Sequence, residues 1–166
     1  MAVELYIVRH AIAADRGPEW PDDNKRPLIQ RGIDRFKESV DGLVWLDVQV
    51  DVVLTSPLLR AKQTAELLAA GLPEKPPVKV CDVLAPGHTS IETMEQIARD
   101  SHGETRVALV GHEPDLGELT AWLVGTRRPI PYKKGGVARL EMDSLSSRHG
   151  TLAWLATPKM LRKLGR

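Results

Sequence analysis

The stretch "LYIVRHAIA", residues 5–13, decides the fold. Four apolar residues are followed directly by Arg9 and His10, and then by small residues. A second stretch, "VALVGHEPD" at residues 107–115, repeats the arrangement with four apolar residues, one glycine and then His112. Apolar residues in succession, rather than in alternation, are typical of parallel strands that helices cover on both faces. We therefore predict two buried strands that are each followed by a histidine.

Short apolar or β-branched runs recur along the chain, and each is bounded by turn or helix signals. We predict strands at Leu5–Val8, Asp51–Thr55, Val78–Cys81, Arg106–Val110, Val137–Met142 and Thr151–Ala156. Helical patterns between and after them predict helices at Gly32–Trp45, Pro57–Ala70, Ser90–Asp100 and Pro114–Val124. This alternation is typical of an α/β fold with three layers, in which helices flank a mainly parallel central sheet. The last two strands, separated by a polar stretch at 144–150, predict an antiparallel hairpin at one edge.

Composition sets limits on partners and compartment. The 166 residues contain no linker, repeat or low-complexity segment, so we expect a single domain over residues 1–166. With 23 basic and 22 acidic side chains the net charge is +1, which provides no field for attracting nucleic acid or a membrane surface. The single Cys81 excludes an intrachain disulfide, and no Cys/His spacing resembles a zinc site. No apolar run resembles a signal peptide or a membrane span. We expect a cytoplasmic protein with neither a metal nor another cofactor.

Three strand ends carry the residues of chemical interest. Arg9 and His10 follow the first predicted strand, and Ser56 and Arg60 follow the second. His112 follows the fourth predicted strand, Arg106–Val110. In open parallel sheets, ligands bind in the crevice outside the carboxyl ends of the strands. We therefore expect these side chains to converge on one pocket, bordered by the loop Ala11–Gln30.

The position of Arg60 predicts a bound anion. Ser56 is a good N-cap and Pro57 a good first helical residue, so Arg60 falls in the first turn of a helix. The helix dipole disfavours a cation there by several tenths of a kcal/mol. A phosphate, with a charge of about −1.5 to −2, would compensate and would accept paired bonds from a guanidinium. Arg9 would be a second guanidinium that binds the phosphate. An ordinary ion pair of Arg60 is the alternative.

Three motifs together resemble a known family. "VRHA", "TSPLLRAKQTAELL" and "VGHEPDL" stand in the order and approximate spacing of the histidine phosphatase superfamily. The segment "KRPLIQRG" resembles its SixA-type phosphohistidine phosphatase branch, as do "GGVARLEM" and "LAWLATPKML" near the end of the chain. The resemblance implies a phosphoglycerate mutase-like fold and a phosphatase activity.

The resemblance also implies roles for individual residues. His10 would be the nucleophile that is transiently phosphorylated, and Arg9, Arg60 and His112 would hold the phosphate. Arg26 resembles a residue near the phosphate in the SixA-type branch, although an exposed loop arginine is an equal alternative. Glu113 would either orient a neighbour or be an ordinary acidic residue at a helix start. Two guanidiniums and a second imidazole can stabilise phosphoryl transfer without a metal.

The segment "LAPGHTSIE", residues 84–92, bears on the substrate. The mutase-like and phosphomonoesterase branches of the superfamily carry a carboxylic general acid in this region, whereas no convincing acid motif stands here. An alkoxide leaving group needs a proton, while a phosphorylated imidazole leaves as a far weaker base. We therefore expect a phosphohistidine-bearing protein as the substrate. A small phosphorylated metabolite remains an alternative, with Glu113 or Asp15 as proton donor, as does a catalytically idle phosphate-binding module.

Two residues depart from the family pattern, and several others lie outside the motifs. Ala11 stands where the family commonly has glycine, and Ile29 where a hydroxyl residue usually stands. We expect Trp45, Trp122 and Trp154 in the core, while Trp20 is placed either against a substrate or in a lid. The basic tail "KMLRKLGR" is expected to complement the end of a last helix. His88, His102 and His149 are expected in solvent.

Overall fold

The computed structural model describes residues 2–166, and these form one six-stranded mixed sheet in the order β3-β2-β4-β1-β5-β6. The strands are β1 (Val3–Arg9), β2 (Val52–Thr55), β3 (Val78–Val80), β4 (Arg106–Gly111), β5 (Val137–Met142) and β6 (Gly150–Ala156). The first four strands pair in parallel, whereas β5 is antiparallel to both β1 and β6. The predicted α/β fold, with a mainly parallel sheet and an antiparallel edge hairpin, is confirmed.

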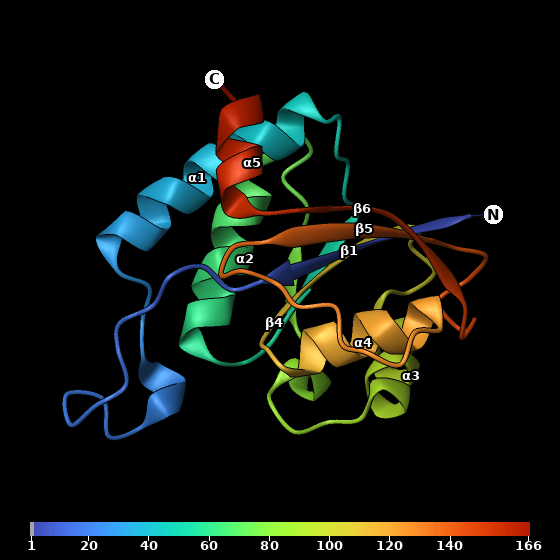
Figure 1. The fold of residues 1–166 in the computed structure, drawn as a ribbon, viewed down its shortest axis with the longest axis horizontal. Coiled ribbons are helices and arrows are strands. Elements are labelled where there is room, and N and C mark those ends of the chain that lie inside the picture. Colours follow the sequence, from blue (N-terminus) through green and yellow to red (C-terminus); the bar gives the residue numbers. More distant parts are fainter. Residues whose placement is uncertain (1) are drawn as a thin grey trace.

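Helices cover both faces of this sheet, so the molecule has the three predicted layers (Figure 1). The helices are α1 (Gln30–Trp45), α2 (Leu59–Gly71), α3 (Ser90–Asp100), α4 (Asp115–Val124) and α5 (Pro158–Leu164), with 3-10 turns η1 (Asp23–Lys25) and η2 (Asp82–Leu84). Helices α1, α2 and α5 pack on one face, and α3 and α4 pack on the other. No helix in residues 2–166 has the length and apolar character to cross a membrane.

The continuous apolar run of β1 is explained by these two helical layers. Tyr6 and Val8 belong to the core beneath α1, α2 and α5, whereas Leu5 and Ile7 belong to the core beneath α3 and α4. Successive side chains of a strand point to opposite faces, so both sets must be apolar. The same division holds in β4. Burial on both faces therefore fixes the central strands from which the candidate site projects.

The start of α2 differs from the prediction. The helix begins at Leu59 rather than at Pro57, and its N-cap position is Leu58, which makes no side-chain capping bond. Ser56 is therefore not the N-cap. Its hydroxyl instead accepts a hydrogen bond from the Leu58 N–H at 3.2 Å, so it stabilises the turn that precedes the helix. Arg60 still lies in the first turn, as the second residue of α2.

The tryptophan prediction is wrong for Trp45. That side chain is 66% exposed at the last position of α1, where the amphipathic pattern ends and no other element covers it. Trp122 and Trp154 are partly buried and pack against the two cores. The basic tail forms α5, with Arg162 and Lys163 in its last turn. His88, His102 and His149 are exposed, as predicted.

A glycine contact joins the loop after β1 to α1. A Cβ atom at Gly32 would overlap the carbonyl group of Ile12. The same carbonyl accepts a hydrogen bond from the Ile29 N–H at 3.1 Å. The first turn of α1 therefore lies directly against the backbone that follows His10, which only a residue without a side chain allows.

Candidate active site

The two histidines meet at the carboxyl edge of the sheet. His10 directly follows β1, and its N–H donates to the carbonyl oxygen of Gly111 at 3.1 Å, which ties it to the end of β4. His112 follows Gly111. The centroids of the two imidazole rings are 5.2 Å apart, and the ring planes are tilted by 52°. Parallel pairing of β1 with β4 thus brings together two residues that are separated by about a hundred positions in sequence.

The contacts of His10 define which ring nitrogen is reactive. Its Nδ1 lies 2.7 Å from the carbonyl oxygen of Ala11. Because a carbonyl oxygen only accepts, Nδ1 carries the proton and Nε2 keeps a free lone pair. Burial lowers the pKa of His10 to about 4, and the nearby Arg60 and Arg9 charges act in the same direction, against the opposing effect of the Ala11 bond. His10 is therefore an uncharged imidazole near neutral pH.

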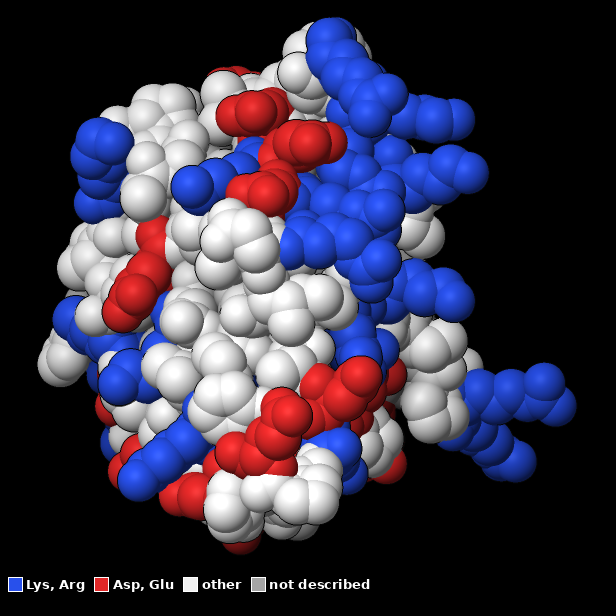
Figure 2. All heavy atoms as spheres, turned by 90° about the vertical axis from the view of Figure 1, so that its left-hand side faces the viewer, with Lys and Arg blue, Asp and Glu red and all other residues white. Residues whose placement is uncertain are grey.

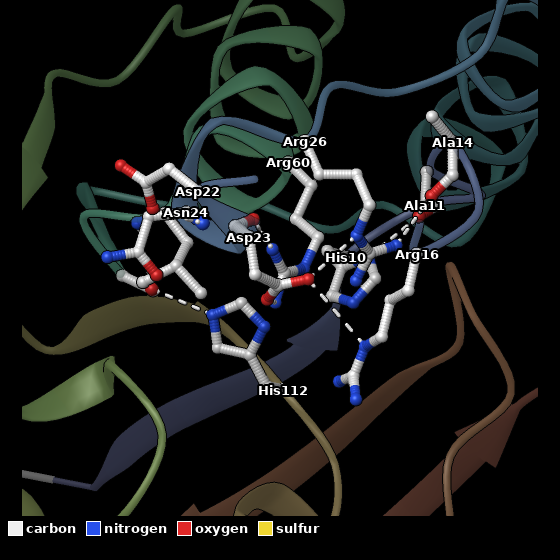
Figure 3. Close-up of polar contacts among 12 residues, drawn as sticks. His10, Ala11, Ala14, Arg16, Asp22, Asp23, Asn24, Arg26, Arg60 and His112 are labelled. Carbon is white, nitrogen blue, oxygen red and sulfur yellow. Dashed lines mark hydrogen bonds and ion pairs between the residues drawn. The ribbon is translucent and has the colours of Figure 1, made fainter. Parts of the chain in front are cut away.

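His112 uses its two ring nitrogens in the opposite way, because its Nε2 is hydrogen-bonded and its Nδ1 is free of partners in the described chain. Its Nε2 lies 2.8 Å from the Ser56 hydroxyl, which also accepts from the Leu58 N–H. A hydroxyl oxygen can accept twice, but Ser56 is fully buried, and among the described residues Nε2 is the one acceptor in reach of its proton, so the hydroxyl donates to Nε2. Nδ1 then carries the ring proton. This buried Nδ1 has no hydrogen-bond partner within residues 2–166, and Figure 3 shows it on the side of the ring toward His10. Burial first, and then His10, lower the pKa of His112 to about 3.

Arg60 is buried and paired with Asp23. One guanidinium nitrogen donates to the Asp23 carbonyl oxygen at 2.8 Å, and the other donates to the Asp23 carboxylate at 3.0 Å. The side chain is 3% exposed, so the ion pair is not an ordinary surface pair. Its Nε is buried without a partner in the described chain. The anion that compensates this cation at the start of α2 is thus, in part, a carboxylate of the protein itself.

Arg26 is gathered into the same cluster (Figure 3). Its Nε donates to the Asp23 carboxylate at 3.0 Å, and one terminal nitrogen donates to the Ala14 carbonyl oxygen at 2.6 Å. At 7% exposure it is not the exposed loop arginine of the alternative interpretation. Arg16 approaches the same carboxylate at 3.6 Å. Burial acts to raise the pKa of Asp23, but the bond from Arg26 and the three arginine charges outweigh it and hold that pKa below its usual value.

Arg9 and Glu113 are linked through one backbone segment. The Arg9 guanidinium donates to the Tyr132 carbonyl oxygen at 2.7 Å, and its Nε is buried without a partner among residues 2–166. The Glu113 carboxylate accepts from the Gly117 N–H at 2.7 Å and lies 3.5 Å from the Tyr132 N–H. Burial raises the pKa of Glu113. Glu113 therefore both anchors the start of α4 and holds the segment that Arg9 contacts.

A cavity of about 480 Å³ collects these groups. All six residues singled out from the sequence line it: Arg9, His10, Arg26, Arg60, His112 and Glu113. Arg16 and Lys134 add two further cations, and Asp15 adds an acid. The cavity thus combines an uncharged imidazole with several fixed cations, which suits a tetrahedral anion.

Some contributors escaped sequence reasoning. Asp23 stands three residues before Arg26, but nothing in "PDDNKRPL" separates it from the adjacent Asp22. Tyr132 contributes through its carbonyl oxygen, which no sequence pattern identifies. Ser56 was expected to cap a helix, and its contact with His112 depends on the packing of β2 against β4.

Comparison with known proteins agrees with this fold and site. The family model described as histidine phosphatase superfamily (branch 1) matches residues 5–85. An uncharacterised protein of Picosynechococcus sp. is 36% identical over 96% of this chain and 99% of its own length. Phosphohistidine phosphatase SixA of Escherichia coli K12 is 29% identical over 96% and 97% of the two chains. A solved structure of the protein histidine phosphatase SixA complexed with tungstate superposes with a TM-score of 0.83 at 27% identity, covering 94% of this chain and 97% of that one.

These similarities span nearly the whole chain. The chain belongs to the histidine phosphatase superfamily, and it is a phosphatase with a phosphoglycerate mutase-like fold. Within that superfamily its branch is the SixA type.

Proposed function

We propose that this protein is a metal-independent phosphatase that dephosphorylates phosphohistidine in a protein, through a phosphorylated His10. The observation that carries the proposal is the orientation of His10. Its proton is held on Nδ1 by a main-chain carbonyl, and its uncharged Nε2 is left as a nucleophile in a cavity of cations. Covalent catalysis of this kind divides one difficult displacement into two easier ones.

In the first step, the Nε2 lone pair forms a bond to phosphorus while the phosphorus–nitrogen bond of the substrate breaks. A substrate imidazole that is protonated on its other ring nitrogen leaves as neutral imidazole. In the second step, water attacks the phosphorus of phospho-His10, and phosphate and free His10 result. Each step needs mainly alignment and stabilisation of charge on the three peripheral oxygens.

Three buried donors support the proposed role of the surrounding residues. The Nε atoms of Arg9 and Arg60 and the Nδ1 of His112 lack a hydrogen-bond partner within residues 2–166. A buried N–H without a partner costs roughly 1–3 kcal/mol. Phosphate oxygens would satisfy such donors, and the charge of the two guanidiniums would stabilise the transition state without a metal. Arg26 would act at the rim of this site, and Glu113 would position the Arg9 contact.

The leaving group supports a phosphohistidine substrate. The Glu113 carboxylate oxygens are engaged by the main-chain N–H groups of Gly117 and Tyr132, at 2.7 and 3.5 Å, and are therefore not free to donate a proton to a leaving group. An alkoxide would need such a donor, whereas neutral imidazole does not. The alternative, a small phosphorylated metabolite, is favoured by the raised pKa of the same carboxyl group and by a cavity volume in the range of small-ligand pockets.

A labelling experiment tests the mechanism. A protein carrying radiolabelled phosphohistidine is mixed with the enzyme and quenched rapidly without acid, and label is expected on the enzyme. His10→Ala should abolish both label and turnover, while His149→Ala, an exposed histidine, is the matched control. An unchanged rate in His10→Ala would contradict the mechanism. Loss of activity in excess chelator would contradict metal independence.

A substrate comparison tests the specificity. Values of kcat/KM for a phosphohistidine-bearing protein are compared with those for nitrophenyl phosphate and sugar phosphates. We expect the protein to be preferred. A strong preference for the esters would select the metabolite alternative.

A further inference from the structure

A second cavity lies beside the candidate active site, between α1 and α5. It has a volume of about 330 Å³. Phe36 and Ser39 of α1 and Pro158 of α5 contribute to its floor, and Phe36 is 2% exposed. Figure 1 shows α1 and α5 side by side on one face of the sheet. We call this cavity the α1–α5 groove.

The rim of the α1–α5 groove is uniformly basic. Its charged lining residues are Arg35, Lys133, Lys134, Lys159 and Arg162, and no acidic residue of the described chain lines it. Among the ion pairs of residues 2–166, none involves any of these five side chains. Figure 2 shows lysines and arginines gathered along one edge of this side of the molecule. In a chain with a net charge of +1, this is a local field rather than a general one.

The groove adjoins the cavity of the candidate active site, which we call the phosphate cavity. Lys134 lines both, and its charge is close enough to lower the pKa of His10. The Gly135 N–H contacts the carbonyl oxygens of Arg9 and His10 at 3.1 and 3.0 Å. Ala11, the neighbour of His10, also lines the groove. One wall of the groove is thus built on the backbone that carries the candidate nucleophile.

From this geometry we infer that the α1–α5 groove docks an acidic, amphipathic segment of the phosphorylated protein substrate. The inference rests on the proposed function and names the partner's surface chemistry. Apolar side chains of the segment contact the partly buried Ile12 and Pro158, and its carboxylates pair with the five rim cations. A phosphohistidine next to that segment then enters the neighbouring cavity past Lys134. A small phosphorylated metabolite would occupy the phosphate cavity and leave the groove empty.

Direct binding tests the groove without catalysis. Three fluorescein-labelled peptides carry leucine at helical spacing, with glutamate, glutamine or lysine at the other positions. Fluorescence anisotropy should show the glutamate peptide binding at least about tenfold more tightly than the glutamine peptide, with an affinity that falls as salt increases. Equal binding of the three peptides would overturn the inference.

Charge reversal locates the binding. Lys133→Glu with Lys159→Glu changes two exposed rim residues, and should weaken binding of the glutamate peptide at least about tenfold. Arg35→Glu, on a different helix, should also weaken it. The control Arg127→Glu with Arg128→Glu makes the same charge change on exposed residues that line neither cavity, and should bind like the wild type. Equal binding by wild type and both rim variants would place the peptide elsewhere and overturn the inference.

Phosphorylated versions of the peptides separate this inference from the proposed function. If a peptide with both glutamates and phosphohistidine binds through the rim but is not dephosphorylated, the proposed function fails and the groove stands. If glutamate and glutamine phosphopeptides are turned over with equal kcat/KM, the groove inference fails and the function stands. A dimer in sedimentation experiments that Lys133→Glu with Lys159→Glu dissociates would overturn the inference, because a second copy would then cover the groove.

Discussion

His112 presents an N–H, and His10 presents a lone pair, across a ring-to-ring distance of 5.2 Å. The two imidazoles are uncharged for the same reason, burial, but their hydrogen-bond partners fix opposite tautomers. A main-chain carbonyl selects the form of His10, and the Ser56 hydroxyl selects the form of His112. The pair therefore offers one nucleophile and one donor to a single phosphoryl group.

Removal of the donor should slow catalysis without preventing folding. We expect His112→Ala to lower kcat by about 100-fold or more, because one preorganised donor to the transferring group is lost. Ser56→Ala should have a smaller effect in the same direction, since it releases the tautomer but keeps the imidazole. Steady-state kinetics on both variants, with circular dichroism to verify folding, measures this order. A larger loss in Ser56→Ala than in His112→Ala would contradict the assigned tautomer.

The two buried histidines should make stability depend on pH. Their pKa values are about 4 and about 3 in the folded chain, against a usual value of 6.5. Between about pH 4 and pH 6.5 the unfolded chain binds more protons than the folded chain, so the free energy of unfolding rises with pH. The contribution of the two histidines to stability is fully present above about pH 6.5. As pH falls from there toward 4, we expect a loss of about 3 kcal/mol from His10 alone.

Urea unfolding at a series of pH values measures this effect. The double variant His10→Ala with His112→Ala should show a flatter dependence of the unfolding free energy between pH 4 and 6.5. An NMR titration of His10 should place its midpoint near pH 4. Equal pH dependence in wild type and double variant would show that the histidines are not buried in neutral form.

Asp23 should act by positioning arginines. Asp23→Ala removes the carboxylate that holds Arg60 and Arg26, and we expect kcat/KM to fall by roughly tenfold to a hundredfold as the guanidiniums lose their alignment. Asp23→Asn, which retains one acceptor oxygen, should lose less. The adjacent Asp22→Ala is the control, because within the described residues the Asp22 side chain accepts only from the Asn24 N–H. Equal rates for Asp22→Ala and Asp23→Ala would refute the positioning role.

Gly32 should be intolerant of a side chain. Gly32→Ala places a methyl group against the Ile12 carbonyl, and such overpacking costs about 1–3 kcal/mol, more than the roughly 1 kcal/mol gained in helix propensity. We expect a lower unfolding free energy and a lower kcat, because Ile12 is close to His10 in the chain. Gly17→Ala, where a Cβ would meet nothing within 4 Å, should stay within about 0.5 kcal/mol of the wild type. Calorimetry on the two variants provides the comparison.

The central strands could be predicted from sequence because they are buried on both sides. Leu5–Val8 and Arg106–Val110 lie within β1 and β4, and the continuous apolar residues Leu5–Val8 and Val107–Val110, bounded by turn signals, indicate strands of this kind. The convergence of Arg9, His10, Arg60 and His112 on one cavity followed from parallel pairing of β1, β2 and β4, together with the start of a helix just after β2. Their catalytic roles remain a prediction.

The features that could not be predicted from the sequence depend on tertiary packing. Ser56 has the chemistry of an N-cap, but the position of His112 gives its hydroxyl another partner. Trp45 continues the helical pattern of α1, but no element extends far enough to cover it. Asp23 is one of several acids in a polar loop, and only the folding of that loop onto α2 makes it the partner of Arg60.

The strand order of the sheet affects how the active-site cavity unfolds. Strands β1, β2 and β4 are each hydrogen-bonded on both sides, whereas the sheet borders are β3 and β6. Fraying at either border leaves the backbone beneath both histidines intact, so the His10 amide, which donates to the Gly111 carbonyl oxygen, should be among the slowest to exchange with deuterated solvent. Inactivation by heat should therefore coincide with global unfolding instead of preceding it.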